Sequence, residues 1–447
     1  MISSRVIPVD LLNVFPFCAK IFVESQRPKR LGEVPDMSRK GKKIWDVIII
    51  GAGASGMMAA ITAAGRGKSV LLLEQMDKPG KKLLATGNGK CNYTNAHMQA
   101  ECFHGDPVFV QHILDRFSHQ DCVAFFRELG IYPKEKNGYF YPNSEQAASV
   151  LQVLERELIR RKVSLLTGTC LKQIEQDSYS YICDTSAGCY YGKNLILATG
   201  LLAAPKLGSN GSAFGAIKEL GHRFMPILPA LCGFYCDGMP FKKVSGVRCE
   251  ALLTLNIDGQ VAEKERGELQ LTDYGVSGIP VFQLSSPAVR ALYEKKAVRM
   301  QINFLPQMDS KALSEELQGR RERSYEEETA EQLLCGLVNQ KLIGVCLVSA
   351  GIKPDTKTIM LSDKCLRAIA KVLTQTEVTL LRVREAEYAQ VCTGGIRTTD
   401  VNPDTLESLI CPGVYIAGEL LDVDGICGGY NLQWAWSTGY VAGQSVG

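Results

Sequence analysis

The stretch IWDVIII at residues 44–50 runs straight into GAGASG at residues 51–56, and this junction decides the fold. The first segment is almost continuously apolar, as expected for a parallel strand that is buried on both faces. The second is a GxGxxG turn, followed by an alanine-rich stretch at 57–65 that can pack a helix closely against a sheet. A further strand at 69–73 ends in Glu74. This order of strand, glycine turn, helix, strand and acid predicts an α/β fold with a dinucleotide site.

The glycine turn and Glu74 each have a physical role in holding a dinucleotide. Glycines permit a tight turn and a close backbone approach, and the helix N-terminus directs its free N–H groups at a pyrophosphate. Glu74 lies 74 − 51 = 23 residues after Gly51, where a carboxylate can accept hydrogen bonds from a ribose and disfavours the extra phosphate of NADP. The fingerprint alone does not separate FAD from NAD.

Composition narrows the classes of protein. The 447 residues carry 50 Lys and Arg against 47 Asp and Glu, a net charge of 50 − 47 = +3, and the longest apolar runs are of strand length. Sixteen cysteines occur without a CxxC pair or regular spacing. We therefore expect a cytoplasmic protein with reduced thiols, no metal site, no membrane association and no nucleic-acid partner.

The segment 1–43 differs from the rest of the chain. It is basic and rich in helix-breaking residues from residue 24 onward, and Met37 stands just ahead of the first clear strand. We expect this segment to be a disordered arm or the product of a mis-annotated start.

Further glycine clusters favour a flavin. The loop GKKLLATGNGKCNYTN at 80–95 can wrap an extended cofactor, and residues 195–198 form another buried strand, which ends in the small turn Thr199-Gly200 of the ILATG motif at 196–200. Near the end of the chain, a strand at 413–417 is followed by Glu419, and glycines at 428 and 429 open a helical stretch at about 432–441. The positive end of such a helix suits an anionic reduced flavin. Glu419 could bind a ribityl hydroxyl or only cap a neighbouring helix.

These motifs, with LTDYGVSGIP at 271–280, TGGI at 393–396 and VYIAGELLDVDGICGGYNLQWAWSTGYVAG at 414–443, resemble the HI0933-like flavoprotein family over about residues 44–447. Members are FAD-dependent oxidoreductases that include aminoacetone oxidase-like enzymes and a bile-acid 3-dehydro Δ4,6-reductase. The resemblance implies a discontinuous Rossmann-like FAD-binding domain at 44–204 and 392–447. It also implies a β-barrel-like substrate domain at 205–304 and 375–391, with a helical insert at 305–374. GSNG at 208–211 is interpreted only as a glycine loop, so no separate NAD(P)H domain is expected.

By motif position, the resemblance assigns a set of expected FAD contacts. They are Gly51, Gly53, Ala54, Ser55, Gly56, Glu74, Gln75, Lys82, Gly87, Asn88, Gly89, Cys91, Asn92, Cys170, Thr199, Gly200, Gly418, Glu419, Gly429, Tyr430, Asn431 and Leu432. Family members often carry Arg where this chain has Tyr139, and Arg where it has Lys90. Loss of the arginine fork at 139 argues against bidentate carboxylate recognition and favours a less anionic or more planar substrate.

The expected function is that of an FAD-dependent oxidoreductase acting on a small organic molecule. NAD(P)H can serve as a transient co-substrate of a reductase, which we favour, or oxygen can accept the electrons in an oxidase; a steroid or bile-acid enone is one candidate substrate. The alternatives are a flavoprotein of tRNA modification and a non-catalytic flavin redox sensor. No catalytic acid or base is identified, and the oligomeric state is left open. Cys91 and Cys427 are expected to pack uncharged near the flavin, and His104, His112 and His119 to be surface or structural residues.

Overall fold

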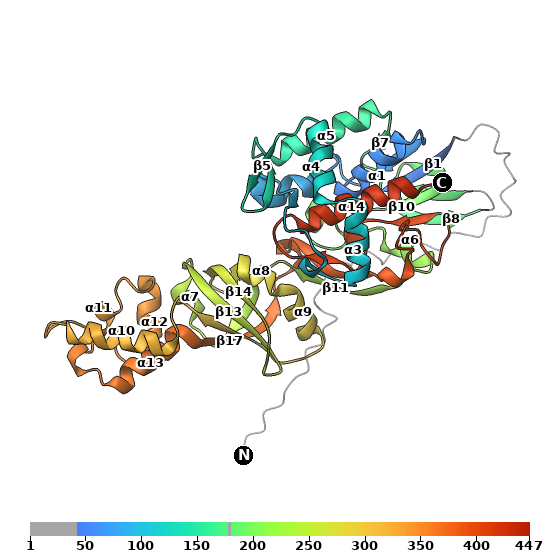
Figure 1. The fold of residues 1–447 in the computed structure, drawn as a ribbon. Helices are drawn as coiled ribbons and strands as arrows, with labels where there is room; N and C mark the ends of the chain where they lie inside the picture. The colour runs from blue at the N-terminus through green and yellow to red at the C-terminus, as the bar shows by residue number, and fades with distance from the viewer. Residues whose placement is uncertain (1–42, 178–179) are drawn as a thin grey trace, which may run out of the picture. The chain divides into compact units, whose positions relative to one another are not determined.

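The computed structural model describes residues 43–177 and 180–447 (Figure 1). Its main sheet has the strand order β7-β2-β1-β10-β9-β8, and β19 pairs with the C-terminal half of β10. The neighbours β7, β2, β1, β10 and β19 run parallel, whereas β9 and β8 are antiparallel additions. The bounds are β1 Ile44–Ile50, β2 Val70–Leu73, β7 Ser164–Leu166, β8 Leu171–Gln176, β9 Tyr181–Thr185, β10 Gly188–Leu197 and β19 Val414–Ile416.

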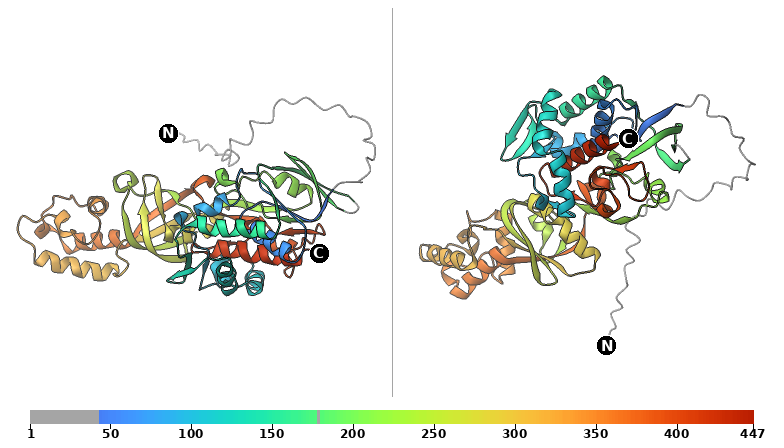
Figure 2. Two further views of the ribbon diagram at one scale, coloured as in Figure 1. Left: turned by 90° about the horizontal axis from the view of Figure 1, so that it is seen from above. Right: turned by 45° about the vertical axis from the view of Figure 1, so that its right-hand side comes forward.

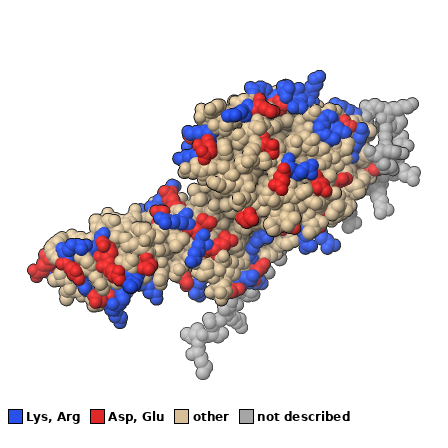
Figure 3. Space-filling view, in the orientation of Figure 1, with Lys and Arg blue, Asp and Glu red and all other residues tan. Residues whose placement is uncertain are grey.

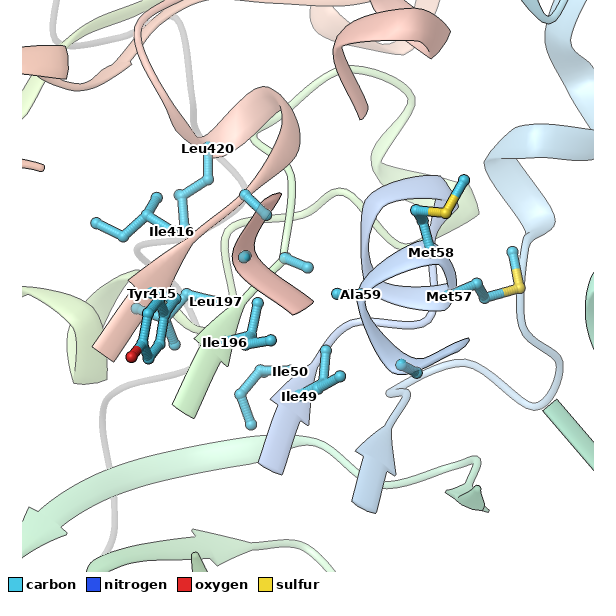
Figure 4. Close-up of a cluster of buried hydrophobic side chains, with 14 of the residues drawn as sticks. Ile49, Ile50, Met57, Met58, Ala59, Ile196, Leu197, Tyr415, Ile416 and Leu420 are labelled. Atoms are coloured by element: carbon cyan, nitrogen blue, oxygen red, sulfur yellow. The ribbon is translucent and has the colours of Figure 1, made fainter. Parts of the chain in front are cut away.

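The sheet is built from segments that are far apart in the sequence. Ile48 of β1 pairs with Leu71 on one side and with Leu195 on the other, and Leu195 in turn pairs with Val414. All four side chains are fully or almost fully buried, as expected for strands with helices or loops over both faces. Figure 4 shows the apolar side chains of β1, β10 and β19 beside those of the first helix.

Two helices pack face to face across this junction. Helix α1 (Ala54–Gly65) follows the glycine turn, and α14 (Tyr430–Ser445) lies directly against it. The contact is close because α14 presents glycine: a Cβ at Gly443 would lie 2.6 Å from the carbonyl oxygen of Ala59. The early blue and late red elements therefore share one part of the molecule (Figures 1 and 2).

The middle of the chain forms a closed antiparallel barrel with the order β12-β15-β14-β13-β16-β17 and its own hydrophobic core. Its strands are β12 Phe234–Asp237, β13 Arg248–Ile257, β14 Gln260–Leu271, β15 Gly275–Gly278, β16 Val298–Asn303 and β17 Thr376–Val383. Four helices intervene between β16 and β17, namely α10 Ser310–Glu322, α11 Ala330–Leu333, α12 Gln340–Ser349 and α13 Asp363–Gln375. The predicted α/β class with a Rossmann-type sheet and a barrel is confirmed; the predicted arm at 1–43 lies almost entirely outside the described residues.

Short elements join the barrel to the main sheet. Strand β11 (Phe224–Ala230) pairs with β18 (Val391–Ile396), and helix α9 (Ser285–Tyr293) packs on β11. Ser286 and Arg290 of α9 contact Asp424, whose side chain is fully buried. Charged and polar groups therefore hold the barrel against the late segment of the chain.

The remaining helices are α2 Lys81–Ala85, α3 Pro107–Arg116, α4 His119–Glu128, α5 Ala147–Arg160, α6 Phe214–Glu219, α7 Phe241–Val244 and α8 Ile279–Gln283. Small sheets are formed by β3 (Thr94–Asn95) with β6 (Tyr139–Pro142) and β5 (Pro133–Lys136), and by β4 (Phe103–His104) with β20 (Asp424–Gly425). Within the described ranges, no helix is both long and apolar enough to cross a membrane.

Candidate functional site

A cavity of about 830 Å³ lies where the parallel strands end and α1 begins. One part is lined by the glycine turn at 51–55, by Glu74, by the 198–200 turn and by the loop at 207–213. The other part reaches the barrel side, where Leu231, Ile279 and Phe282 line it. The carboxyl ends of parallel strands are where α/β folds bind dinucleotides, so its position agrees with the predicted site.

The glycine turn is shaped for close backbone approach. Gly51 has φ of +102°, and a Cβ there would lie 2.5 Å from the carbonyl oxygen of Ala198. At Gly53, by contrast, a Cβ would meet nothing within 4 Å, so this part of the backbone is open to the cavity. Helix α1 has no side-chain cap, which leaves its first N–H groups free for an anion.

Glu74 is held by the turn that it faces. Its Oε2 accepts a hydrogen bond from the Ala52 N–H at 2.8 Å, and its Oε1 accepts one from the Met76 N–H at 2.8 Å. Burial raises the pKa of this carboxyl above its usual value, partly offset by those N–H donors. Glu74 therefore both fixes the turn and lines the cavity.

The neighbouring Gln75 ties β2 to the loop at 207–213. Its side-chain amide donates to the carbonyl oxygen of Gly208 and to Asn210 Oδ1, and it accepts from the hydroxyl of Ser212 at 2.9 Å. Several residues of this loop line the cavity beside Glu74. The GSNG segment, interpreted from the sequence only as a glycine loop, thus forms one wall of the site.

Lys82 and Glu419 form an ion pair inside the cavity. Lys82 Nζ lies 2.7 Å from Glu419 Oε2, and Glu419 Oε1 accepts from the Cys392 N–H at 2.8 Å. Both side chains are about four-fifths buried, so this is not a freely solvated pair. The pair links the early loop to the 3-10 helix at Gly418–Leu420.

An unpaired buried acceptor lies at the N-terminus of α14. Asn92 lines the cavity and is 9% exposed, and its Oδ1 has no hydrogen-bond partner among the described residues. A Cβ at Gly429, the N-cap of α14, would lie 2.9 Å from that oxygen. A planar polar ring that carries both N–H and carbonyl groups would satisfy both: its N–H would donate to the orphan oxygen, and its carbonyl oxygens would accept from the free helix N–H groups. Together with the open backbone at Gly53, these residues fit FAD.

Most of the predicted cofactor contacts line this one cavity. The exceptions are Gly56, Gly89, Cys91, Cys170, Gly418 and Tyr430. A Cβ at Gly56 would overlap the Gly51 carbonyl oxygen, which makes it a packing glycine, and Thr169 and Leu171 line the wall on either side of Cys170.

Cys91 and Tyr430 are packed away from the cavity. Burial raises the pKa of the Cys91 thiol to about 12, which keeps it an uncharged thiol. Tyr430 packs edge-on against Phe103 with ring centroids 5.9 Å apart. Cys427 does line the cavity, and burial also raises its pKa.

Two tyrosines line the cavity close to the glycines at 87 and 428. Tyr139 and Tyr141 are two residues apart on β6, and both line the cavity with half-buried side chains. Burial raises the pKa of both phenols above the usual value of 10.0. Tyr139 was singled out from the sequence, but Tyr141 was not. Because side chains two residues apart on a strand lie on the same face, Tyr141 could have been inferred to accompany it.

The histidines lie apart from the cavity. His104 lies in β4, and its Nδ1 is 3.1 Å from the buried Asp424 Oδ2. His112 pairs with Asp404, and His119 opens α4. No cluster of three or more His, Cys, Asp or Glu that could hold a metal occurs in the described part of the chain.

Comparison with known proteins places the chain in a family. The model of the HI0933-like protein Rossmann domain matches residues 45–445. The chain is 41% identical to the 3-dehydro-bile acid delta(4,6)-reductase of Clostridium scindens, over 89% of this chain and 98% of that protein. It is 29% identical to the ribosomal RNA dihydrouridine synthase of Escherichia coli, over 90% of this chain and 98% of that protein.

Among solved structures, the 3-ketosteroid-delta4-(5alpha)-dehydrogenase of Rhodococcus jostii RHA1 aligns with 92% of this chain and 99% of its own at 15% identity and a TM-score of 0.44. The family match covers the glycine turn, the barrel and the late glycine cluster alike. The protein belongs to the HI0933-like family of FAD oxidoreductases.

Proposed function

We propose that this protein is a reductase that takes electrons from NAD(P)H and reduces a carbon–carbon double bond conjugated to a carbonyl group in a small, largely apolar ring compound. The observation that carries the proposal is the continuity of the cavity. The glycine turn at 51–55, which is predicted to bind a dinucleotide, lines the same cavity as Tyr139, Leu231 and Phe282. The 41% identity to a protein named as a bile-acid reductase supports the same substrate class.

The barrel-side wall suits an apolar planar molecule. Leu231 is buried, Phe282 is partly buried, and both face the cavity together with the exposed Ile279. Tyr139 packs its ring against Gly428, since a Cβ there would lie 2.8 Å from the tyrosine Cε1. Aromatic and aliphatic surfaces of this kind gain free energy by covering apolar ring area.

The chain's own residues would divide the work of binding and proton supply. FAD supplies the hydride-carrying ring when it is bound. The free N–H groups of α1 and α14 bind anionic groups, and Asn92 Oδ1 accepts from a ring N–H. The Tyr139 hydroxyl remains protonated at neutral pH, because burial raises its pKa, and it can donate to a substrate carbonyl oxygen. In the overall reaction, one hydride from NAD(P)H and one proton add across the double bond.

Anaerobic titration tests the electron donor. Bleaching of the flavin absorbance by NADH or NADPH, followed by slow recovery in air and fast recovery with a 3-keto-Δ4 steroid, is the expected result. Fast recovery in air without substrate would instead identify an oxidase. Reduction by neither nicotinamide would contradict the proposal and favour a flavin redox sensor.

Substitution at the wall tests the substrate end. Tyr139→Phe removes the hydroxyl and keeps the ring, so we expect a lower rate of substrate reduction with unchanged flavin bleaching by the nicotinamide. Tyr141→Phe is the matched control on the same strand. Equal rates for all three proteins would exclude Tyr139 as a donor.

A second candidate function is reduction of uridine in ribosomal RNA, which is favoured by the relatives named as rRNA dihydrouridine synthases. The target would again be a double bond conjugated to a carbonyl. The expectation that no nucleic acid is bound is therefore open. Lys and Arg are interspersed with Asp and Glu over the face seen in Figure 3, rather than gathered into one basic stripe. Conversion of uridine to dihydrouridine in added rRNA, measured by mass spectrometry, distinguishes the two functions.

A further inference from the structure

A row of stacked guanidinium and phenol groups lies beside the cavity. We define it as the Arg–Tyr stack: Arg382, Tyr235, Tyr274, Arg384 and Tyr388. The Arg382 guanidinium lies 3.5 Å from the centre of the Tyr235 ring, and the Tyr235 and Tyr274 rings are 5.1 Å apart. The Arg384 guanidinium then lies 4.5 Å from the Tyr274 ring and 3.5 Å from the Tyr388 ring. The stack ends at Tyr388, which is 54% exposed.

The stack stands at the edge of the site already described. Tyr388 ends the 3-10 helix η6 (Ala386–Tyr388), and the adjoining Glu387, Ala389 and Gln390 line the cavity. The backbone of Ala386 accepts a hydrogen bond from the Ala204 N–H at 3.0 Å, which ties η6 to the wall around 204–213. A ligand on the exposed face of Tyr388 would therefore have the cavity beside it.

Of the cations in and beside the stack, Arg384 has no carboxylate partner among the described residues. Arg382 pairs with Glu385 at 2.7 Å, and Lys206 pairs with Glu387 at 3.3 Å. Arg384 forms no ion pair with any residue that the structure describes, and its buried Nε has no acceptor there. Among the described residues, the Arg384 guanidinium contacts the faces of the Tyr274 and Tyr388 rings and donates a hydrogen bond to the Tyr274 hydroxyl oxygen.

A planar base with phosphates attached matches this arrangement. Tyr388 is exposed enough to stack an aromatic ring, and the Arg384 guanidinium against its ring attracts phosphate oxygens. We propose that the Arg–Tyr stack binds the adenosine diphosphate end of NAD(P)H, so that the nicotinamide end can enter the cavity. This inference rests on the proposed function, because it supplies a docking site for the electron donor that this function requires.

Direct binding of ADP-ribose to the FAD-loaded protein tests the stack without any redox step. The variants are Tyr388→Ala, which removes the ring, and Tyr388→Phe, which keeps it. Tyr325→Ala is the matched control, because Tyr325 is 58% exposed and lies in the helical insert outside the stack. We expect calorimetry to show ADP-ribose binding weakened about five- to 150-fold in Tyr388→Ala. Tyr388→Phe and Tyr325→Ala should bind as the unaltered protein does.

The flavin reduction assay separates the two proposals. In Tyr388→Ala, the NAD(P)H concentration for half-maximal flavin reduction should rise by a similar factor, while the rate at saturation, the FAD content and photoreduction stay unchanged. Unaltered ADP-ribose affinity in Tyr388→Ala, or no binding to the unaltered protein at millimolar ADP-ribose, would overturn the inference. Tyr388-dependent binding of a single-stranded RNA oligonucleotide in place of ADP-ribose would also overturn it. Failure of NADH and NADPH to reduce the flavin, with Tyr388-dependent ADP-ribose binding intact, would overturn only the reductase function.

Discussion

Replacing Gly443 by alanine should weaken both the fold and cofactor retention. An added Cβ would lie 2.6 Å from the Ala59 carbonyl oxygen and 2.8 Å from Thr62 Cβ, whereas ordinary contacts begin at 3.4 Å. Helix α14 must therefore move away from α1 by up to 3.4 − 2.6 = 0.8 Å. Overpacking against backbone costs about 3 kcal/mol, at the upper end of the usual range, and the better helix propensity of alanine returns about 1 kcal/mol. The net loss is about 2 kcal/mol.

The assay is thermal unfolding followed by flavin fluorescence, which reports loss of the cofactor together with the fold. With an unfolding entropy of about 2.1 cal/mol/K per residue over roughly 400 folded residues, a loss of about 2 kcal/mol corresponds to a decrease of about 2–3 °C in the melting temperature. Gly344→Ala is the matched control, because Gly344 lies inside α12 and a Cβ there meets nothing within 4 Å. That variant should gain about 1 kcal/mol from helix propensity. If both variants shift the melting temperature equally, the close approach of α14 to α1 does not limit stability.

Three further predictions concern single side chains. Lys82→Met leaves the Glu419 carboxylate without its cation, so the ratio of FAD to protein after gel filtration should fall. Lys134→Met is the control, because it breaks an ion pair with Glu145 outside the cavity lining. An unchanged ratio in Lys82→Met would contradict the role of the pair. At His104, burial lowers the pKa but the contact with Asp424 outweighs it, so the folded pKa is raised. The stability that this contact adds is therefore present below the unfolded pKa of about 6.5 and is lost as the pH rises through the folded pKa. Urea denaturation should show a larger cost of His104→Gln at about pH 6 than at about pH 9, and equal costs would refute the assignment. Cys91→Ala should leave flavin reduction unchanged, and iodoacetamide should not label Cys91 in the folded protein, because its pKa of about 12 keeps the thiol uncharged.

Local patterns predicted the parts of the molecule that depend on local physics. The apolar run at 44–50 and the glycine turn after it predict β1 and α1, because a buried strand and a tight turn both depend on residues that are adjacent in the sequence. The barrel was expected from the family resemblance, and the antiparallel order of its strands depends on contacts between distant segments.

The parts of the site that the sequence did not reveal depend on tertiary contacts. Lys82 and Glu419 are 337 residues apart, and their pairing follows only from the docking of the late segment on the early loop. The wall at 207–213 lies beside Glu74 because Gln75 bonds to it, which no motif encodes. Cys170 was expected at the site from the family resemblance alone, but its neighbours Thr169 and Leu171 line the cavity instead.

The packing of α14 against α1 has a consequence for the synthesis of this protein. Tyr430 follows Ala54 by 430 − 54 = 376 residues, so at about 5–20 residues per second α14 is made about 20–75 s after α1 begins. Throughout that interval the side of α1 that faces α14 has no partner, although α1 can already pack on β1, β2 and α5, and the orphan oxygen of Asn92 has no helix end beside it. We therefore expect the cavity to be complete only after α14 has been made, and a chain interrupted before α14 to be degraded rather than active.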